Sequence, residues 1–258
     1  MNLDLKNKNV VITGASRGLG SNIADLFEKE GSNLILIARD DSQLKKKIKQ
    51  YKRNKMHNYI SCNLRDKNIP TKIAKDIIKK YKKIDILVHN VGGGLGIKNY
   101  LDNTDKWIDV WNFNVGIAIE MNNVIIPNMK KNKGGKIIHI SSVNAVSGGT
   151  MIEPFGGAPA YTCAKSYLNM YVKTVGREVA KYNIIMNGVM PGPILSKGKH
   201  WEKLLKSNPS FVKEYLKQNH AINRFAKFEE ISPFVLLLSS KYSGYSSGSF
   251  ISLDGGIL

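Results

Sequence analysis

Short apolar runs rich in β-branched residues alternate along this chain with longer segments in which apolar residues recur at helical spacing. The apolar runs cover residues 10–13, 33–38, 59–62, 84–88, 136–140, 184–189 and 249–253. Helical patterns cover residues 19–30, 41–53, 71–81, 105–129, 159–182 and 229–239, with an irregular helical excursion over 199–219. Strands that alternate with helices in this way pair in parallel and are covered on both faces. The pattern therefore predicts an α/β fold, doubly wound around a seven-stranded parallel sheet.

A single domain is expected to span residues 1–258, because the chain contains no linker, repeat or low-complexity segment. Its length suffices for a sizeable buried core. No apolar run reaches the length of a membrane span, and the first residues lack the apolar core of a signal peptide. Cys62 and Cys163 are too few for a disulfide framework, which agrees with a reducing compartment. We therefore expect a cytoplasmic protein.

The formal charge of +19 is the unusual feature of the composition. Such a charge could serve a nucleic acid or an anionic membrane. The 39 basic residues, however, comprise only six arginines and 33 lysines, and the lysines are spread along the whole chain. Arginine is the preferred side chain for bidentate recognition of phosphates and bases. The charge pattern thus favours a solvated surface and argues against nucleic-acid and membrane partners.

Three glycines occupy the turn between the first predicted strand and the first predicted helix. Glycine lets the backbone approach a pyrophosphate, and the following helix presents free N–H groups and a positive dipole end to it. The alternative is a plain tight turn, but a position between strand and helix is the context that indicates dinucleotide binding. The residues expected to contact a cofactor in this glycine loop are Gly14, Ser16, Arg17, Gly18, Leu19 and Gly20.

Tyr161 and Lys165 lie four residues apart in a predicted helix, so their side chains share one face. A free phenol has a pKa of about 10, and lowering it toward ~7 requires roughly 4 kcal/mol. An ammonium group about 4 Å away in a partly desolvated site can supply that amount. A tyrosine tuned in this way can donate a proton to a carbonyl oxygen while a hydride reaches the carbon. By spacing alone, a surface lysine near a tyrosine would be the better explanation.

The glycine spacing, together with the preceding Thr13, resembles the short-chain dehydrogenase/reductase family. Residues 89–92, His-Asn-Val-Gly, are similar to the family's Asn-Asn-Ala-Gly motif beside the adenosine. Residues 191–194, Pro-Gly-Pro-Ile, resemble its nicotinamide loop, and 253–256 resemble its C-terminal motif. The resemblance covers the whole chain and implies a Rossmann fold with helices on both faces of the sheet.

The resemblance also implies a catalytic set, which is Asn114, Ser142, Tyr161 and Lys165. Ser142 would orient the substrate oxygen, and its neighbour Ser141 is the competing candidate; the family places the catalytic serine just before Val143. Asn114 would cap a backbone irregularity and hold a water that relays protons to Lys165, or it is simply a satisfied buried amide. The cofactor contacts implied outside the glycine loop are Arg39, Asn63, Leu64, Asn90, Val91, Gly92, Tyr161, Lys165, Pro191, Gly192, Ile194 and Ser196.

The residues after the second predicted strand indicate which nicotinamide cofactor is used. A carboxylate at the first loop position would favour the free ribose hydroxyl of NAD. This chain has Arg39 there and Arg17 in the glycine loop, and a charge-assisted hydrogen bond to a phosphate is worth about 1.5–3 kcal/mol. NADP is therefore expected, with NAD as the less favoured cofactor because Asp40 and Asp41 follow. Asn63 stands where the family usually has an aspartate on the adenine edge.

Two segments, about 144–159 and 194–220, are expected to form substrate loops or a lid. The first is longer than the family norm, and its Met151, Ile152 and Phe155 could wall a pocket. The second carries a dense group of basic and aromatic side chains: Lys197, Lys199, His200, Trp201, Lys203 and Lys206. This charge either attracts an anionic substrate or forms solvated surface. The five histidines show no metal-ligand spacing, so no metal is expected.

The leading hypothesis is an NADP-dependent oxidoreductase that acts on a carbonyl or secondary alcohol of a small molecule. A 3-oxoacyl-thioester-like or a sugar-derived substrate would suit it. The alternatives are a catalytically inactive nucleotide-binding or regulatory protein on the same fold, and a basic nucleic-acid-binding module.

A homo-oligomer, tetramer or dimer, is expected because the family assembles through the helices that bear Asn114 and Tyr161. Both helices have extra apolar positions in this chain: Ile117, Ile119, Met121, Leu168, Met170 and Val172.

Overall fold

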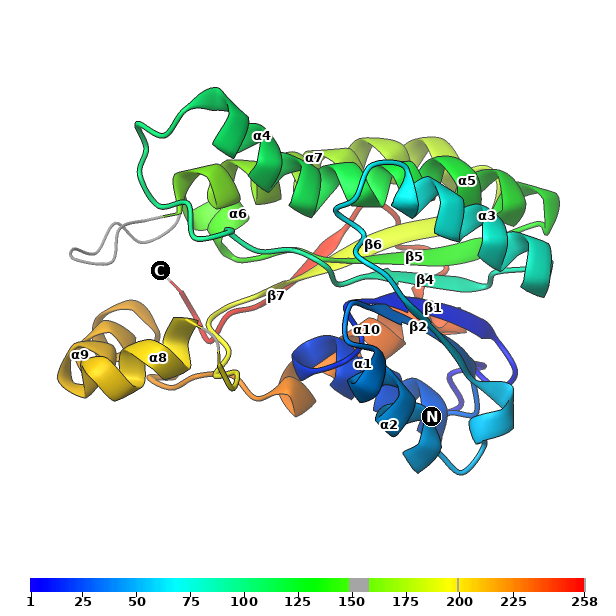
Figure 1. Cartoon of the computed structure of the whole chain (residues 1–258), viewed down its shortest axis with the longest axis horizontal. Helices are drawn as coiled ribbons and strands as arrows, with labels where there is room; N and C mark the ends of the chain where they lie inside the picture. The colour runs from blue at the N-terminus through cyan, green and yellow to red at the C-terminus, as the bar shows by residue number, and fades with distance from the viewer. Residues whose placement is uncertain (149–157, 199, 258) are drawn as a thin grey trace.

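Seven parallel strands form one sheet in the order β3-β2-β1-β4-β5-β6-β7 (Figure 1). We describe residues 1–148, 158–198 and 200–257 of a computed structural model. The strands are β1 (Asn9–Thr13), β2 (Asn33–Ala38), β3 (Asn58–Ser61), β4 (Ile86–His89), β5 (Gly135–Ile140), β6 (Ile184–Pro191) and β7 (Phe250–Leu253). The predicted seven-stranded parallel sheet is confirmed. The strand order reverses between β1 and β4, which pair directly, and ligands of open α/β sheets bind at such a switch point.

Helices cover both faces of the sheet (Figure 1). One face carries α3 (Ile69–Tyr81), α5 (Ile117–Lys131) and α7 (Pro159–Ala180), and the other carries α1 (Gly18–Lys29), α2 (Asp41–Gln50) and α10 (Phe228–Ser239). The remaining helices are α4 (Thr104–Trp111), α6 (Asn144–Ser147), α8 (His200–Ser207) and α9 (Pro209–Asn219), with short turns η1 (Asn54–Met56), η2 (Asn112–Gly116) and η3 (Lys241–Ser243). No helix within the described ranges is long and apolar enough to cross a membrane.

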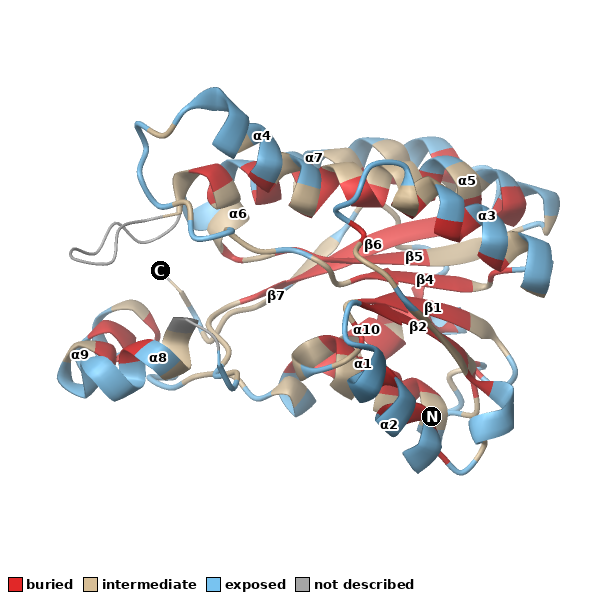
Figure 2. Ribbon diagram, viewed as in Figure 1, coloured by how far each residue is buried: buried red, intermediate tan, exposed pale blue. Residues whose placement is uncertain are grey.

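The inner strands β1, β2, β4, β5 and β6 are largely buried between the two helical layers, whereas the edge strands β3 and β7 are only partly buried (Figure 2). In β1, Val11 packs with the cluster under α3, α5 and α7, while Val10 and Ile12 pack with the cluster over α1, α2 and α10. Alternate residues of a strand point to opposite faces, so a strand covered on both faces must be apolar throughout. This requirement explains the unbroken apolar runs of the sequence.

Some helix boundaries differ from the predicted ones. The helix predicted over 105–129 is not uniform, because it widens into the π-helical turn η2 between α4 and α5. The helix predicted over 41–53 ends at Gln50. The excursion over 199–219 divides into two helices, since the side chain of Asn208 accepts a hydrogen bond from the Phe211 amide at 3.2 Å and caps α9.

Two histidines form a stacked pair inside the sheet layer. His89 and His139 are direct partners across β4 and β5, and their ring centroids lie 4.6 Å apart. His89 Nε2 bonds Asn122 Oδ1 at 2.9 Å, whereas neither ring nitrogen of His139 has a hydrogen-bond partner among the described residues. Burial lowers the pKa of His89 to about 4, and it lowers the pKa of His139 well below 6.5. Both rings are therefore neutral near pH 7.

This pair predicts that acid destabilises the fold. An unfolded histidine titrates near pH 6.5, so between about pH 4 and 6.5 the unfolded chain binds more protons, and the free energy of unfolding falls with falling pH. His89→Asn removes one titrating group and should reduce that slope by up to about 1.4 kcal/mol per pH unit. Urea unfolding of the unaltered protein and of the variant from pH 4.5 to 7.5 measures the two slopes. His57 and His220 are present in both proteins, so their contributions cancel in the difference. Identical slopes would contradict the assignment.

Candidate active site

A cavity of about 530 Å³ opens at the carboxyl ends of β5 and β6. Ser142, which follows β5, and Tyr161, from the first turn of α7, line its floor. Pro191 to Ile194 line it after β6, and Gly94 lines it after β4. The cavity thus lies where a doubly wound sheet binds ligands. It unites residues that are far apart in the sequence.

Tyr161 and Ser142 both line the cavity, and the Ser142 hydroxyl acts on the phenol so as to favour its ionised form. The other candidate, Ser141, donates its hydroxyl to Asn169 Oδ1 at 2.5 Å and is buried. The geometry therefore puts Ser142, rather than Ser141, beside the reactive phenol. Asn144 supports this serine, because its backbone amide donates to Ser142 Oγ at 3.2 Å.

Lys165 is buried and lies one helical turn after Tyr161 in α7. Its ammonium donates to the backbone carbonyl of Ile140 at 2.8 Å and lies 5.7 Å from the ring centroid of Tyr161. Burial lowers the pKa of Lys165 to about 7, since a charged group loses hydration there. The lysine is therefore poised to exchange a proton near neutral pH.

The predicted lowering of the Tyr161 pKa is wrong for this structure. Burial raises the pKa of the phenol, and the hydrogen bond with Ser142 offsets this only in part. Lys165 does not offset this burial, because burial also lowers its own pKa to about 7 and so reduces its positive charge near neutral pH.

Asn114 lies within the π-helical turn η2 and joins it to the loop after β4. Its side-chain amide donates to the carbonyls of Val110 at 2.8 Å and Gly93 at 2.9 Å, and its Oδ1 accepts from the Gly93 amide at 3.0 Å. A Cβ on Gly92 would lie 2.6 Å from Asn114 Oδ1 and 3.1 Å from Lys165 Nζ. The π-helical turn is thus the backbone irregularity expected at Asn114, and Gly92 lies between this turn and Lys165. Only a glycine fits between them.

The glycine loop between β1 and α1 has the form of a phosphate cradle. Gly14 and Gly18 have φ of +68° and +61°, a backbone region that glycine occupies at little cost. A Cβ on Gly20 would lie 2.5 Å from the carbonyl of Gly14, so the turn and the helix pack backbone to backbone. Arg17 occupies the N-cap of α1 without capping it through its side chain. The uncapped helix start fits a pyrophosphate, which would accept from its free amides.

Thr13 connects this cradle to the loop after β4. Its hydroxyl oxygen accepts from the backbone amides of Asn90 at 3.0 Å and Val91 at 3.3 Å. In return the Asn90 side chain donates to the carbonyls of Thr13 and Gly14, each at 3.2 Å. From the sequence, Thr13 is identified only as the residue that precedes the glycine motif, with no role of its own. Its position at the switch point is the signal that could have identified it as a site-organising residue.

The charges beside the loop after β2 are arranged as follows. Arg17 and Arg39 are both exposed. The carboxylate of Asp40 caps α2 by accepting from the Gln43 amide at 3.1 Å and from the Ser42 hydroxyl at 2.8 Å. These two bonds, and then the nearby Arg17 guanidinium, hold the pKa of Asp40 below its usual range. Asp40 is thus engaged within its own helix start, whereas both guanidinium groups face solvent.

Of the other predicted cofactor contacts, Pro191, Gly192 and Ile194 line the cavity, whereas Asn63 and Leu64 follow β3 outside its lining. Gly192 approaches the C-terminal motif so closely that a Cβ would lie 2.8 Å from the Cα of Asp254. Ser196 reaches the glycine loop, since its Oγ would lie 3.6 Å from a Cβ on Gly18. Asn63 donates to Asp66 Oδ1 at 2.6 Å. Leu64 is buried in the core.

Helices α8 and α9 form one wall of the cavity through an aromatic cluster. The rings of Trp201 and Tyr215 are tilted by 31° with centroids 4.8 Å apart, and the ring centroid of Phe211 lies 6.5 Å from that of Tyr215. The apolar wall residues are Trp201, Leu204, Phe211 and Tyr215, with Ile97, Val143, Ile194 and Ile257 around them. Apart from Trp201, sequence reasoning missed the aromatic wall, because tertiary packing decides which face of each lid helix turns inward.

The basic group predicted for this lid does not line the cavity in the described residues. Lys203 and Lys206 are exposed, and Lys206 pairs with Glu202 at 3.5 Å. The lysine that does line the cavity is Lys98, from the loop after β4. Lys199, the side chain of His200, and the predicted wall residues Met151, Ile152 and Phe155 lie outside the described residues. No group of three metal-ligating side chains occurs in the part of the chain that we describe.

Known proteins share this architecture and its motifs. The family model described as short chain dehydrogenase matches residues 8–203. The 3-oxoacyl-[acyl-carrier-protein] reductase FabG of Rickettsia conorii is 32% identical and covers 99% of this chain and 99% of its own. L-Sorbose reductase from Gluconobacter frateurii, complexed with NADPH and L-sorbose, has a TM-score of 0.89 at 30% identity, covering 100% of this chain and 99% of that chain.

A third similar protein is a 7α-hydroxysteroid dehydrogenase complexed with NADH and 7-oxo glycochenodeoxycholic acid. Its TM-score is 0.87 at 25% identity, with 100% of this chain and 96% of that chain covered. The matched span of the family model exceeds half of the sequence, and Leu19, Ser142, Tyr161 and the loop from Pro191 to Ile194 line one cavity. The chain therefore belongs to the short-chain dehydrogenase/reductase family and is an oxidoreductase of that family.

Proposed function

We propose that this protein is an NADP-dependent oxidoreductase that interconverts a carbonyl and a secondary alcohol on a small molecule. The observation that carries the proposal is the position of Tyr161. Its phenol lines the floor of a 530 Å³ cavity, bonded to Ser142 and one helical turn from the buried Lys165. The cofactor cradle of Gly14 to Gly20 opens beside the same strand ends.

Bound NADPH would supply a hydride to the carbonyl carbon of the substrate. Tyr161 then donates its proton to the carbonyl oxygen, and Ser142 orients that oxygen by hydrogen bonding. The raised pKa of Tyr161 keeps the phenol protonated at neutral pH, which suits the direction of reduction. Lys165, whose pKa is about 7 and whose Nζ lies 5.7 Å from the ring centroid of Tyr161, would then resupply the proton that the phenol has lost.

Replacing Tyr161 with phenylalanine tests this mechanism. Tyr161→Phe should reduce kcat by about 10²- to 10⁴-fold, the usual contribution of a general acid, with little change in cofactor affinity. Tyr167→Phe is the matched control, because Tyr167 is an exposed residue of the same helix. NADPH consumption over a panel of carbonyl compounds provides the readout.

Near-normal turnover by the Tyr161→Phe variant would exclude the proposed acid. If the unaltered protein binds NADPH but turns over no carbonyl in the panel, the inactive nucleotide-binding alternative gains support instead.

The choice of NADP is supported by the charges beside the adenosine end of the cradle. Arg17 and Arg39 are exposed there, and the carboxylate of Asp40 already accepts two hydrogen bonds of its own helix. The 2′-phosphate would therefore meet two guanidinium groups beside a carboxylate, Asp40, that its own helix already engages, although Asp41 in the first turn of α2 is also exposed. Of the two similar structures, one is a complex with NADPH and the other with NADH, so the preference for NADP rests on the local charges of this chain.

Removing both guanidinium groups should weaken NADPH selectively. The double variant Arg17→Ala, Arg39→Ala should raise the Kd for NADPH by at least tenfold and leave that for NADH nearly unchanged, since charge-assisted bonds to a phosphate are worth about 1.5–3 kcal/mol. Quenching of protein fluorescence measures both constants. Arg177→Ala, an exposed change on α7, is the control. Equal NADPH and NADH affinity in the unaltered protein would refute the assignment.

The lining of the cavity favours an apolar carbonyl compound over a sugar. Its polar side chains within the described ranges are Lys98, Ser141, Ser142, Asn144, Tyr161 and Tyr215. The hydroxyls of Ser141 and Tyr215 already contact Asn169 and His220. A sugar hydroxyl buried without a partner costs about 1–3 kcal/mol, whereas the aromatic wall favours an acyl chain or a ring system. Lys98 is the described lining group that would receive an anionic end.

Matched substrates test this preference. An apolar bicyclic ketone should exceed a keto sugar in kcat/KM by at least tenfold. Trp201→Ala should remove roughly tenfold or more of the activity on the bicyclic ketone, because a large buried apolar contact is worth about 1.5–3 kcal/mol. Acetoin, too small to reach the wall, serves as the internal control, and Trp201→Phe should restore activity. Preference for the keto sugar would favour the sugar-derived alternative.

We further propose a homo-oligomer, in the cytoplasm, that assembles through α4 and α7. Of the six expected interface residues, Met170 is exposed and Ile119 is partly buried, whereas Ile117, Met121, Leu168 and Val172 are buried in the chain's own core and need correction. Ile108 of α4 and Tyr167 of α7 are further exposed apolar side chains. This exposed face supports an oligomer, and both cysteines are free thiols, which agrees with a reducing compartment.

A further inference from the structure

A second cavity, of about 210 Å³, lies at the opposite end of the sheet from the active site. It opens at the amino ends of β4 and β5 and is closed by residues 239–241, where α10 ends. We call it the amino-end pocket. Its charged lining residues are Asp4, Lys8, Lys83, Asp85, Lys133, Lys136 and Lys241. Five lysines against two aspartates leave a formal excess of three positive charges.

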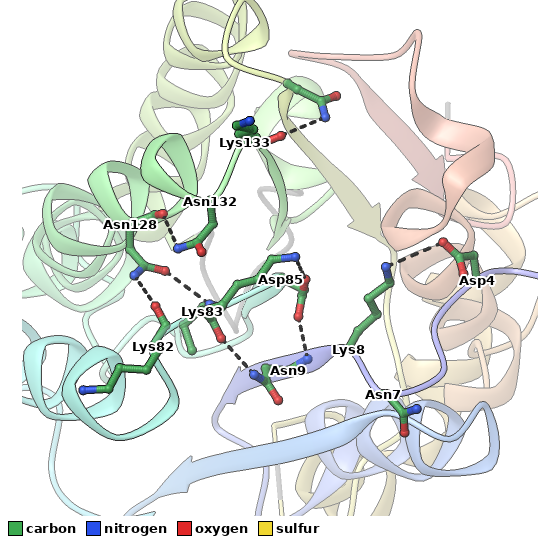
Figure 3. Close-up of polar contacts among 12 residues, drawn as sticks. Asp4, Asn7, Lys8, Asn9, Lys82, Lys83, Asp85, Asn128, Asn132 and Lys133 are labelled. Atoms are coloured by element: carbon green, nitrogen blue, oxygen red, sulfur yellow. Dashed lines mark hydrogen bonds and ion pairs between the residues drawn. The ribbon is translucent and has the colours of Figure 1, made fainter.

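Both aspartates are already paired (Figure 3). Lys83 Nζ lies 2.8 Å from Asp85 Oδ1, and Asp85 Oδ2 accepts from the backbone amide of Asn9 at 2.9 Å. Lys8 Nζ lies 3.6 Å from Asp4 Oδ2. These carboxylates are therefore not available to neutralise the other three lysines, Lys133, Lys136 and Lys241, for which the described residues provide no ion pair.

Lys136 is the informative member of this group. It is partly buried, and its ammonium donates to a neutral partner, Ser243 Oγ, at 3.0 Å. Burial without a counter-charge lowers its pKa. Holding a cation away from water is unfavourable unless an anion compensates it. Two donors of this ammonium remain for such an anion.

The remaining polar groups of the pocket show what kind of anion would fit. The backbone amides of Gly134, Gly135 and Lys136 already donate to protein carbonyls, and so does the side chain of Asn183. Recognition would therefore depend on lysine ammonium groups, which bind phosphate as point charges. A volume of 210 Å³ is below the roughly 300–1,000 Å³ of typical ligand pockets, which points to a small occupant.

We propose that the amino-end pocket binds a small polyvalent phosphate anion, held by Lys133, Lys136 and Lys241. Lysines alone would be expected on the surface of so basic a chain. The cavity, the two neutralised aspartates and the partly buried, uncompensated Lys136 distinguish this cluster from solvated surface.

Inorganic pyrophosphate is the probe, titrated into the full-length protein by calorimetry at constant ionic strength. Lys136→Met should weaken binding at least tenfold, and Lys133→Met should weaken it several-fold. Pyrophosphate could also enter the cofactor cradle, so Arg17→Met controls for that site. Lys217→Met, an exposed change on α9, controls for net charge. Neither control variant should alter the amino-end binding.

Thermal unfolding gives a second readout that does not depend on enzyme activity. At one hundred times its Kd, pyrophosphate should raise Tm by about 5 °C, and Lys136→Met should abolish most of this shift even if the variant itself is less stable. Equal binding by Lys136→Met, loss of binding in Arg17→Met, or an equal shift from sodium chloride at matched ionic strength would overturn the proposal. Tight binding of duplex DNA without binding of pyrophosphate would overturn it in favour of a nucleic-acid surface.

Discussion

The candidate active site depends on the close approach of the Gly92 backbone to two polar side chains. Gly92 runs between Asn114 and Lys165 so closely that a single added carbon would meet both polar groups. This approach fixes the loop after β4, the π-helical turn η2 and the helix α7 relative to one another. Thr13 fixes the same loop to the glycine cradle through two backbone amides. The glycine loop, the loop after β4 and the helix that carries Tyr161 and Lys165, to which we assign the cofactor and the proton transfer, thus form one packed unit at the switch point of the sheet.

The sequence predicts most of this architecture because its signals are local. Apolar runs and helical periodicity place the seven strands, and the spacing of Gly14, Gly18 and Gly20 places the cradle in the right turn. The capping role of Asp40 and the inward wall of Trp201 and Tyr215 could not be predicted. They depend on which groups meet in three dimensions, and a sequence pattern does not contain those distances.

The effect of burial on the pKa values of interior groups could not be predicted from the sequence either. The spacing of Tyr161 and Lys165 correctly places both groups on one helix face, but it gives no measure of desolvation. In the structure, burial acts on both groups in the direction of neutrality: the phenol retains its proton and the amine tends to lose its own. The same effect keeps the stacked histidines uncharged in the middle of the sheet.

The π-helical turn η2 has a consequence for how this enzyme can change. The amide of Ile117 bonds the carbonyl of Asn112, five residues earlier, and the Asn114 side chain takes the carbonyl of Val110. Deleting one residue from 112–116 would remove the extra residue that this wide turn accommodates and restore ordinary helical hydrogen bonding. The Asn114 side chain would then no longer bridge the carbonyls of Val110 and Gly93, so the loop after β4 would lose its polar link to this helix.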